Sequence, residues 1–292
     1  MMKLLITGPY GFLGSHIVNH FVKLNIYKIV AVVKKTSVNT RLSNEILNEI
    51  EIIYSDEKSL QCFFESNNVQ GIIHTATNYG RNATLTDIIE SNILFPLKLI
   101  ELSKESNLQF FVNFDTYFNK GNIGYNYLGN YVLSKYHFEQ WIKKVDNIKI
   151  FNLKLEHLYG PNDSENKFVQ FILNSIVDNK EYIKLTSGGQ KRDFIFIDDV
   201  VRLVQEITEK QNVMKDVFYD LEVGTGKSIS IKDFVILLKS ELGNKKTKLL
   251  FGSLEERENE IMDSKANLSK MPDELNWKPL IDLREGIVNL IS

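Results

Sequence analysis

Short apolar stretches alternate with longer amphipathic ones through the first half of the chain. The apolar runs have strand length, and we expect strands at Leu4–Thr7, Ile29–Val33, Ile50–Tyr54, Gly71–His74, Phe110–Phe114 and Ile148–Lys154. Runs without polar alternation are typical of parallel strands that helices cover on both faces. Helical spacing of apolar residues predicts helices at Gly14–Lys23, Leu85–Ser106 and Tyr131–Val145. The alternation predicts an α/β fold with a doubly wound, parallel Rossmann-type sheet.

The pattern changes after Tyr159-Gly160-Pro161, where segments become shorter and charged stretches such as Glu255–Glu258 appear. A helix near Asp198–Glu209 is expected to return to the first sheet. The remainder predicts a smaller, mixed α/β lobe. We therefore expect one domain at residues 1–157 plus about 193–218, and a second lobe at about 158–192 and 219–292.

Composition narrows the classes of partner. The net charge of −2 over 292 residues gives no basic excess, which argues against a nucleic-acid partner. Cys62 is the only cysteine, so an intrachain disulfide and a cysteine-based zinc site are excluded by count, and we expect no metal. No apolar run approaches the roughly 18 residues that cross a bilayer, so a soluble, cytoplasmic protein without a membrane partner is expected.

A glycine-rich turn follows the first predicted strand. Gly8, Gly11 and Gly14 form the pattern GxxGxxG between that strand and a helix. The first glycines permit a tight turn and a close approach of the backbone to a pyrophosphate, and the last lets the helix pack on the strand. The amide groups at the start of the helix attract the anion. The pattern predicts a dinucleotide site.

The second predicted strand ends in Lys34 and Lys35, and no acidic residue follows until Glu45. An NAD site usually places an acid here for the ribose hydroxyl. Two ammonium groups attract a 2′-phosphate instead, so we expect NADPH as the cofactor. A pair of solvated surface lysines is the alternative.

Tyr131 and Lys135 form the pattern YxxxK, which places a phenol and an ammonium on one helix face. A nearby cation favours phenolate, so we expect the pKa of Tyr131 to move towards neutrality and the phenol to transfer protons. Tyr125 and Tyr127 are rival phenols, but neither has a lysine four residues later. Thr116 follows the fifth predicted strand, where a hydroxyl can hydrogen-bond a substrate carbonyl.

These residues resemble the extended short-chain dehydrogenase/reductase family, and the likeness covers almost the whole chain. The glycine loop, the YxxxK pair and Thr116 match the family's cofactor loop and catalytic triad. Later motifs that carry the resemblance are Leu158-Tyr159-Gly160-Pro161, Arg192-Asp193-Phe194, Asp198-Asp199-Val200, Glu222-Val223-Gly224-Thr225-Gly226 and Trp277-Lys278-Pro279. The resemblance implies a cofactor site lined by Gly8, Tyr10, Gly11, Phe12, Leu13, Gly14, Lys34, Lys35, Asp56, Thr75, Ala76, Thr77, Tyr131, Lys135 and His157.

The late motifs are similar to those of family members that act on nucleotide sugars. That likeness implies that Arg192 and Arg257 hold a diphosphate, that Glu260 meets a ribose hydroxyl, and that Asn92 and His157 face the substrate. A charged surface loop is the alternative for Arg257, and a structural histidine for His157. Stretches such as Asn259–Met262 resemble the 4-ketoreductases that make CDP-paratose and CDP-abequose.

Four chemistries share this scaffold. The order Asp115-Thr116-Tyr117 lacks the glutamate of a 4,6-dehydratase, and Cys62 lies far along the chain from the second lobe, which disfavours a 3,5-epimerase/reductase. The two lysines argue against a 4-epimerase. We therefore expect NADPH-dependent reduction of the C4 keto group of a nucleotide-linked 4-keto-6-deoxy or 3,6-dideoxy sugar in bacterial surface polysaccharide biosynthesis. A 4-epimerase or dehydratase remains the alternative, and a non-catalytic NADP-binding protein a remote one. The family also implies a homodimer.

Overall fold

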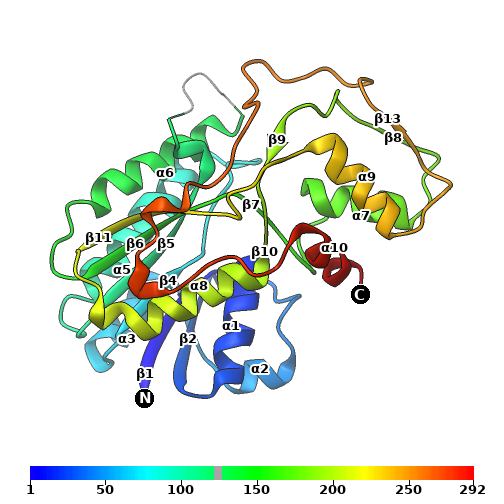
Figure 1. Cartoon of the computed structure of the whole chain (residues 1–292). Helices are drawn as coiled ribbons and strands as arrows, with labels where there is room; N and C mark the ends of the chain where they lie inside the picture. Colours follow the sequence, from blue (N-terminus) through cyan, green and yellow to red (C-terminus); the bar gives the residue numbers. More distant parts are fainter. Residues whose placement is uncertain (122–126) are drawn as a thin grey trace.

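A seven-stranded sheet organises the larger part of the molecule. The computed structural model of the chain describes residues 1–121 and 127–292. The strand order is β11-β6-β5-β4-β1-β2-β3, and every pair is parallel (Figure 1). The strands are β1 (Met2–Thr7), β2 (Tyr27–Val33), β3 (Glu51–Tyr54), β4 (Gly71–His74), β5 (Phe110–Thr116), β6 (Lys149–Leu155) and β11 (Phe218–Val223). The doubly wound sheet predicted from the sequence is confirmed.

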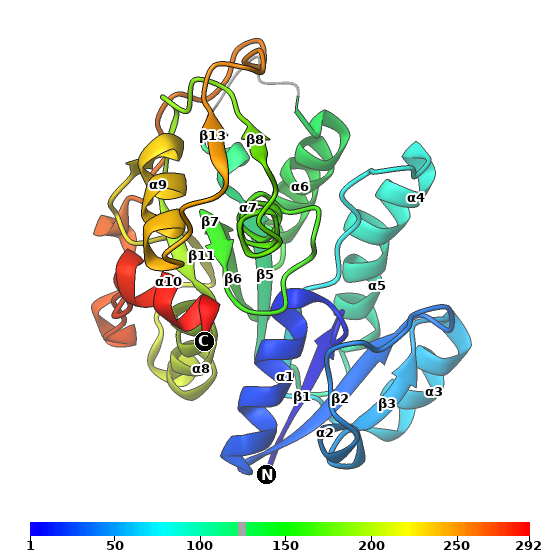
Figure 2. The same cartoon turned by 90° about the vertical axis from the view of Figure 1, so that its right-hand side faces the viewer.

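Helices cover both faces of this sheet. Helices α1 (Phe12–Leu24) and α8 (Ile197–Lys210) pack together on one face, and α3 (Glu57–Ser66), α5 (Phe95–Leu102) and α6 (Gly129–Ile142) lie on the other (Figure 2). The short helix α2 (Asn44–Asn48) precedes β3. The alternation of side chains along β1 serves both layers, because Leu4 and Ile6 belong to one buried core and Leu5 to the other. The continuous apolar runs therefore reflect burial on two faces.

The helix expected at Leu85–Ser106 differs from the prediction. It comprises α4 (Leu85–Ile89), a π-helical turn at Glu90–Leu94 and α5, which ends at Leu102. Pro96 stands at the start of α5. Proline lacks the amide of a regular helical hydrogen bond and its ring clashes with the preceding turn, so a wider π turn precedes it. Hydrogen-bonded turns replace the helix after Leu102, and Asn107 has a left-handed φ of 58°.

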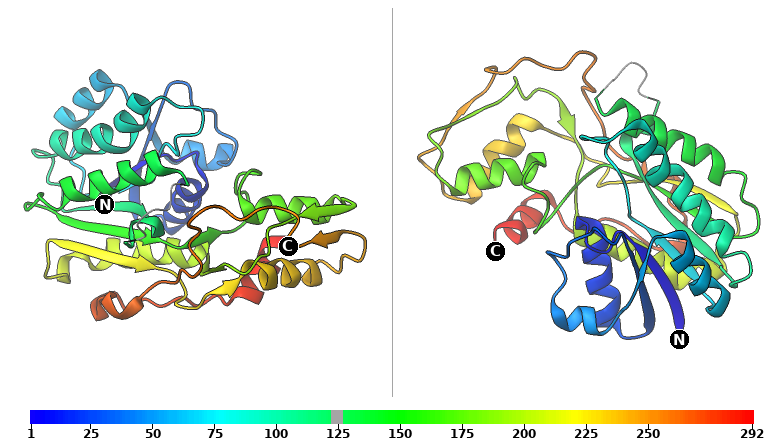
Figure 3. Two further views of the ribbon diagram at one scale, coloured as in Figure 1. Left: turned by 90° about the horizontal axis from the view of Figure 1, so that it is seen from above. Right: turned by 180° about the vertical axis from the view of Figure 1, so that it is seen from behind.

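The second lobe is built from short paired strands and three helices. Parallel pairs join β7 (His157–Tyr159) to β10 (Phe194–Phe196) and β8 (Tyr182–Lys184) to β13 (Lys248–Leu250), and an antiparallel pair joins β9 (Lys191–Arg192) to β12 (Ile229–Ser230). Helix α7 (Phe168–Val177) lies beside α9 (Ile231–Glu241), and α10 (Leu283–Ile291) also contacts α9 (Figure 3). The short β-pairs match the mixed lobe expected from the sequence.

The boundary expected near residue 218 needs a correction. Strand β11, Phe218–Val223, pairs with β6 along its full length and is the edge of the large sheet. Its buried and less buried residues alternate, so it lacks the continuous apolar run that marked the other strands. We keep the two-lobe division as a proposal, with this strand assigned to the first domain.

The late sequence motifs join the two lobes. The buried carboxylate of Asp193 accepts hydrogen bonds from the backbone of Thr225, Gly226 and Ala266. The Trp277 indole donates to the Asp199 carbonyl over 2.9 Å. These contacts tie the end of the chain to both lobes, and several motif residues are therefore structural. No helix in residues 1–121 and 127–292 is long and apolar enough to cross a membrane.

Candidate active site

The glycine loop lies at the carboxyl end of β1. Gly8 has a φ of 65°, and Gly11 precedes the first turn of α1. A Cβ on Gly14 would lie 2.1 Å from the Gly8 carbonyl oxygen, which explains why this position excludes every larger residue. The free amide groups at the start of α1 adjoin the turn, an arrangement that suits a pyrophosphate. The loop therefore fits a dinucleotide without further adjustment.

The residues after β4 hold this loop in place. The Thr75 hydroxyl donates to the Thr7 carbonyl over 2.6 Å, and the Thr7 hydroxyl accepts from the Ala76 amide over 3.1 Å. The Thr7 hydroxyl also bonds His74 Nδ1 at 2.8 Å. Sequence reasoning placed Thr75 and Ala76 at the cofactor but did not foresee Thr7 as their partner. The signal available in the sequence was the place of Thr7, a polar residue at the end of an apolar strand and directly before the glycine loop.

The lysines after β2 diverge. Lys35 pairs with Asp56 at 3.2 Å, and Lys34 donates to the Ser91 hydroxyl over 3.3 Å. Asp56 also caps α3, and the hydrogen bonds from Ser59 are the main cause that lowers the pKa of its carboxyl. Arg41 donates to the carbonyl of Tyr10 in the glycine loop, over 3.0 Å. Lys35, Asp56 and Tyr10 thus share one end of the predicted cofactor site.

The YxxxK pair is buried on α6. Lys135 donates to the Phe114 carbonyl over 2.8 Å, and burial lowers the pKa of Lys135 to about 8. Burial raises the pKa of Tyr131 well above 10, and the Thr116 hydroxyl opposes this effect by hydrogen bonding. The expected shift of Tyr131 towards neutrality is therefore wrong for the chain by itself, because desolvation of the phenolate outweighs the cation. Thr116, the last residue of β5, does adjoin the phenol.

Two further buried polar groups belong to this region, namely Asp115, for which no role was predicted, and Asn92, which was predicted to face the substrate. Asp115 accepts hydrogen bonds from the Thr116 amide and from Asn152, and burial raises the pKa of its carboxyl. Asn92 donates to Ser134 on α6 over 2.9 Å and accepts from the Asn78 amide over 2.7 Å. Asn92 thus braces α6 against the loop after β4. Its contact with a substrate stays a prediction.

The residues predicted for a diphosphate come together. Arg192 contacts Glu260 at 2.5 Å and also donates to the Ile261 carbonyl, and Arg257 lies 3.6 Å from the same carboxylate. Ile261 packs in a buried cluster with Tyr131. The segment 257–261 therefore brings this charged group next to the phenol of Tyr131, although the two regions are far apart in sequence. An incoming anion would share the guanidinium groups with Glu260.

His157 lies at the start of β7, between the two lobes. Its Nε2 is 3.4 Å from the Tyr117 hydroxyl, and its Nδ1 is buried and has no hydrogen-bond partner within residues 1–121 and 127–292. Burial, with the charges of Arg192 and Lys167, lowers the pKa of His157 well below 6.5. The imidazole is therefore neutral at physiological pH. Tyr127, one rival phenol, stacks under Arg257 at 3.8 Å, and Tyr125, the other, lies outside the described residues.

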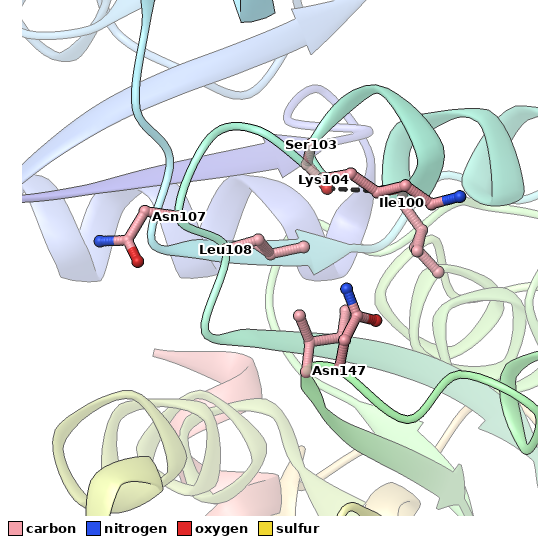
Figure 4. A pocket seen from close by; sticks show the side chains of 7 residues that line it. Ile100, Ser103, Lys104, Asn107, Leu108 and Asn147 are labelled. Atoms are coloured by element: carbon pink, nitrogen blue, oxygen red, sulfur yellow. Dashed lines mark hydrogen bonds between the residues drawn. The ribbon is translucent and has the colours of Figure 1, made fainter.

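A cavity of about 190 Å³ lies elsewhere, at the amino ends of β5 and β6 (Figure 4). Its lining residues are Ile100, Ser103, Lys104, Asn107, Leu108, Asn147 and Ile148. None of the residues predicted for catalysis or binding lines it. The candidate site is the opposite, carboxyl end of the sheet, where ligands of open α/β folds bind.

Comparison with known proteins agrees with this arrangement. Residues 4–219 match the NAD dependent epimerase/dehydratase family. The chain is 33% identical over 297 residues to the CDP-abequose synthase of Salmonella typhimurium, with 99% of this chain and 97% of that protein covered. It is 25% identical over 315 residues to a putative UDP-glucose 4-epimerase of Methanocaldococcus jannaschii, with 99% and 97% covered.

Solved structures share the fold at lower identity. A UDP-glucose 4-epimerase of Thermotoga maritima with UDP-glucose superposes with a TM-score of 0.82 at 22% identity, covering 99% of this chain and 97% of that one. A dTDP-glucose 4,6-dehydratase of Bacillus anthracis in complex with NAD gives a TM-score of 0.82 at 17% identity, with 100% and 96% covered. At these identities the likeness establishes the fold alone.

Proposed function

This chain belongs to the NAD dependent epimerase/dehydratase family, and from that premise we propose that it reduces the C4 keto group of a nucleotide-linked 4-keto-6-deoxy or 3,6-dideoxy sugar, hexose or heptose, with NADPH. The observation that carries the proposal is the cluster of Tyr131, Lys135 and Thr116 at the same carboxyl edge of the sheet as the glycine loop. The similarity to a CDP-abequose synthase supports a nucleotide sugar as the substrate and surface polysaccharide biosynthesis as the setting.

A protonated Tyr131 suits the reduction of a ketone. Reduction of a ketone needs a proton donor, whereas a 4-epimerase or a dehydratase first removes a proton from an alcohol. Burial raises the pKa of Tyr131 well above 10, so the phenol of the chain is protonated at neutral pH. Cys62, the alternative acid/base, is exposed on α3, whereas Tyr131 and Thr116 are buried on α6 and β5. These features support a reductase.

The chain's residues supply the remaining chemistry. When bound, the nicotinamide cofactor supplies a hydride to C4. Tyr131 donates its proton to the C4 oxygen as negative charge develops there, and Thr116 hydrogen-bonds the same oxygen. Lys135 is buried within one helical turn of the phenol, where its charge stabilises the phenolate that remains. Solvent then returns the proton to Tyr131.

The cofactor proposal rests on the lysines and the loop. Gly8 and Gly14 form a turn so tight that a Cβ at either position would overlap neighbouring atoms of the protein, and this turn leads directly into the start of α1. Lys34 and Lys35 supply positive charge at the end of β2, which supports NADPH. A 4-epimerase with bound NAD is the second candidate, because the T. maritima epimerase shares the fold and the M. jannaschii relative is named as one.

The decisive experiment follows NADPH oxidation with CDP-, GDP- and dTDP-linked 4-keto sugars and identifies the product by NMR. We expect stoichiometric NADPH oxidation and a C4 alcohol. Tyr131→Phe should lower kcat about 10²- to 10⁴-fold, because it removes the proton donor. Tyr136→Phe, on the exposed side of the same helix, is the matched control. Interconversion of C4 epimers without net NADPH oxidation would favour the epimerase instead.

A homodimer is proposed with this function. Large apolar side chains are exposed along α4 to α6, and they are Leu85, Ile89, Leu94, Leu133 and Trp141. Neighbouring exposed apolar groups on packed helices are typical of an interface. Sedimentation velocity should give twice the mass of the chain, and Leu133→Glu with Trp141→Glu should return the monomer.

A further inference from the structure

The catalytic phenol is covered by a second tyrosine that no motif marks. The rings of Tyr79 and Tyr131 lie 4.9 Å apart between centroids and are inclined by 35°. Tyr131 is 6% exposed and Tyr79 is 38% exposed, so Tyr79 forms the outer layer. Tyr79 lies in the loop between β4 and α4, whereas Tyr131 is on α6. An offset aromatic pair of this kind restrains both rings.

A cation from the other lobe forms a third layer. The ammonium of Lys167 lies 4.0 Å from the centroid of the Tyr79 ring. Lys167 directly precedes α7, the first helix of the second lobe. The β4–α4 loop and the segment leading to α7 come from different domains (Figure 2). The stack therefore connects the two lobes at the catalytic tyrosine.

The surroundings of Lys167 favour this contact. Among the described residues, no carboxylate lies within ion-pair distance of the Lys167 ammonium, although the charge of Lys167 acts to lower the pKa of Asp163 on the same segment. A cation over an aromatic face within about 6 Å is attracted by the ring quadrupole. Arg192, by contrast, is buried against Glu260. The ammonium of Lys167 thus rests on the aromatic face of Tyr79.

We propose that Tyr79 is a positioning residue for Tyr131, and that Lys167 holds Tyr79 in place across the two lobes. Tyr131 must present its hydroxyl to the C4 oxygen within a narrow range of positions. Because Lys167 comes from the lobe proposed to bind the sugar nucleotide, the orientation of the proton donor depends on contact between the lobes. This inference rests on the proposed reductase function only for its kinetic readout.

A double-mutant cycle tests the coupling with NADPH and a CDP-linked 4-keto-3,6-dideoxy sugar. Tyr79→Leu should lower kcat about 10- to 100-fold with little change in the KM for NADPH, since misplacement of a catalytic group acts on the chemical step. Tyr79→Phe should keep kcat close to the wild-type value, because it retains the aromatic ring. Lys167→Met should lower kcat less, and should have no further effect in the Tyr79→Leu background.

Other outcomes would overturn the proposal. If Lys167 binds the substrate diphosphate directly, Lys167→Met raises the KM for the sugar nucleotide equally in both backgrounds. If the two substitutions lower kcat independently, no bridge exists. Lys180→Met, three residues after the end of α7, is the control for loss of a lysine from this lobe.

A measurement without substrate separates this inference from the reductase proposal. The phenol of Tyr131 is followed by ultraviolet difference titration between each protein and its Tyr131→Phe counterpart. Tyr79→Leu should move the titration of Tyr131 to lower pH, because water reaches the uncovered ring. An unchanged titration in Tyr79→Leu would show that Tyr79 does not define the environment of Tyr131, whatever the chain catalyses.

Discussion

Replacement of Gly14 by alanine provides a direct test of the cofactor loop. The added Cβ would lie 2.1 Å from the Gly8 carbonyl oxygen, about 1.3 Å short of ordinary van der Waals contact, and 2.7 Å from the Thr75 hydroxyl oxygen. Both neighbours are fixed, because the first is backbone and the second donates to the Thr7 carbonyl. Relief of the overlap therefore requires movement of the loop itself.

Overpacking of this kind costs about 1–3 kcal/mol. If the bound loop must keep its present shape, the whole cost appears in the dissociation constant, which should rise about 5- to 150-fold. NADPH fluorescence titration measures that constant without a sugar substrate, and the same titration with NADH shows whether the loss is common to both cofactors. Urea unfolding shows how much of the cost falls on the free protein.

Gly286→Ala is the matched control. Its Cβ would lie 2.0 Å from the hydroxyl of Tyr159, a fully buried ring in the second lobe. The overlap is as severe, but it lies away from the glycine loop, so unfolding should become easier while NADPH binding is kept. The reasoning is refuted if Gly14→Ala binds NADPH as tightly as the wild type, or if Gly286→Ala loses binding equally.

Three further predictions concern charge. Lys35→Glu should lower kcat/KM for NADPH relative to NADH at least about tenfold through loss of a contact with the 2′-phosphate, whereas Lys28→Glu at the other end of β2 should keep the ratio. Burial lowers the pKa of Lys135 from 10.5 to about 8, so between pH 8 and pH 10.5 the folded chain binds fewer protons than the unfolded chain. The unfolding free energy of the wild type should therefore rise with pH in this range relative to that of Lys135→Met. A difference between the two proteins that does not change with pH would contradict this. Asp193→Asn places a donor against the amides of Gly226 and Ala266 and should cost about 2–3 kcal/mol in urea unfolding.

The fold was predictable where local pattern and burial coincide. The six apolar runs became strands because a parallel sheet buries both faces, and the glycine loop fixed the first turn. Strand β11 was not predicted because its buried and less buried residues alternate at the sheet edge. The π turn before Pro96 was not predicted because the helical spacing of apolar residues continues through it. In both cases the missing information was the tertiary neighbour.

The candidate site was predictable only in part. The sequence identified Tyr131, Lys135 and Thr116, which the structure brings together, but their roles stay predictions. The pKa of Tyr131 is raised and not lowered as expected, because the spacing in the sequence indicates a nearby cation but gives no information about burial. The contact of Glu260 with Arg192 and the stacking of Tyr79 on Tyr131 join segments far apart in the chain. No local pattern encodes such contacts.

Strand β11 is synthesised long after its neighbour β6, which affects how the sheet forms during synthesis. The sheet has six strands once residue 155 has emerged from the ribosome, and its edge strand β6 then offers unpaired backbone groups until residues 218–223 are synthesised. During that interval the nascent sheet is open to pairing with other chains. A fragment of the chain that ends near residue 157 has the same unpaired edge at β6. We therefore expect this fragment to aggregate, and to stay in solution only when the segment Phe218–Val223 is supplied.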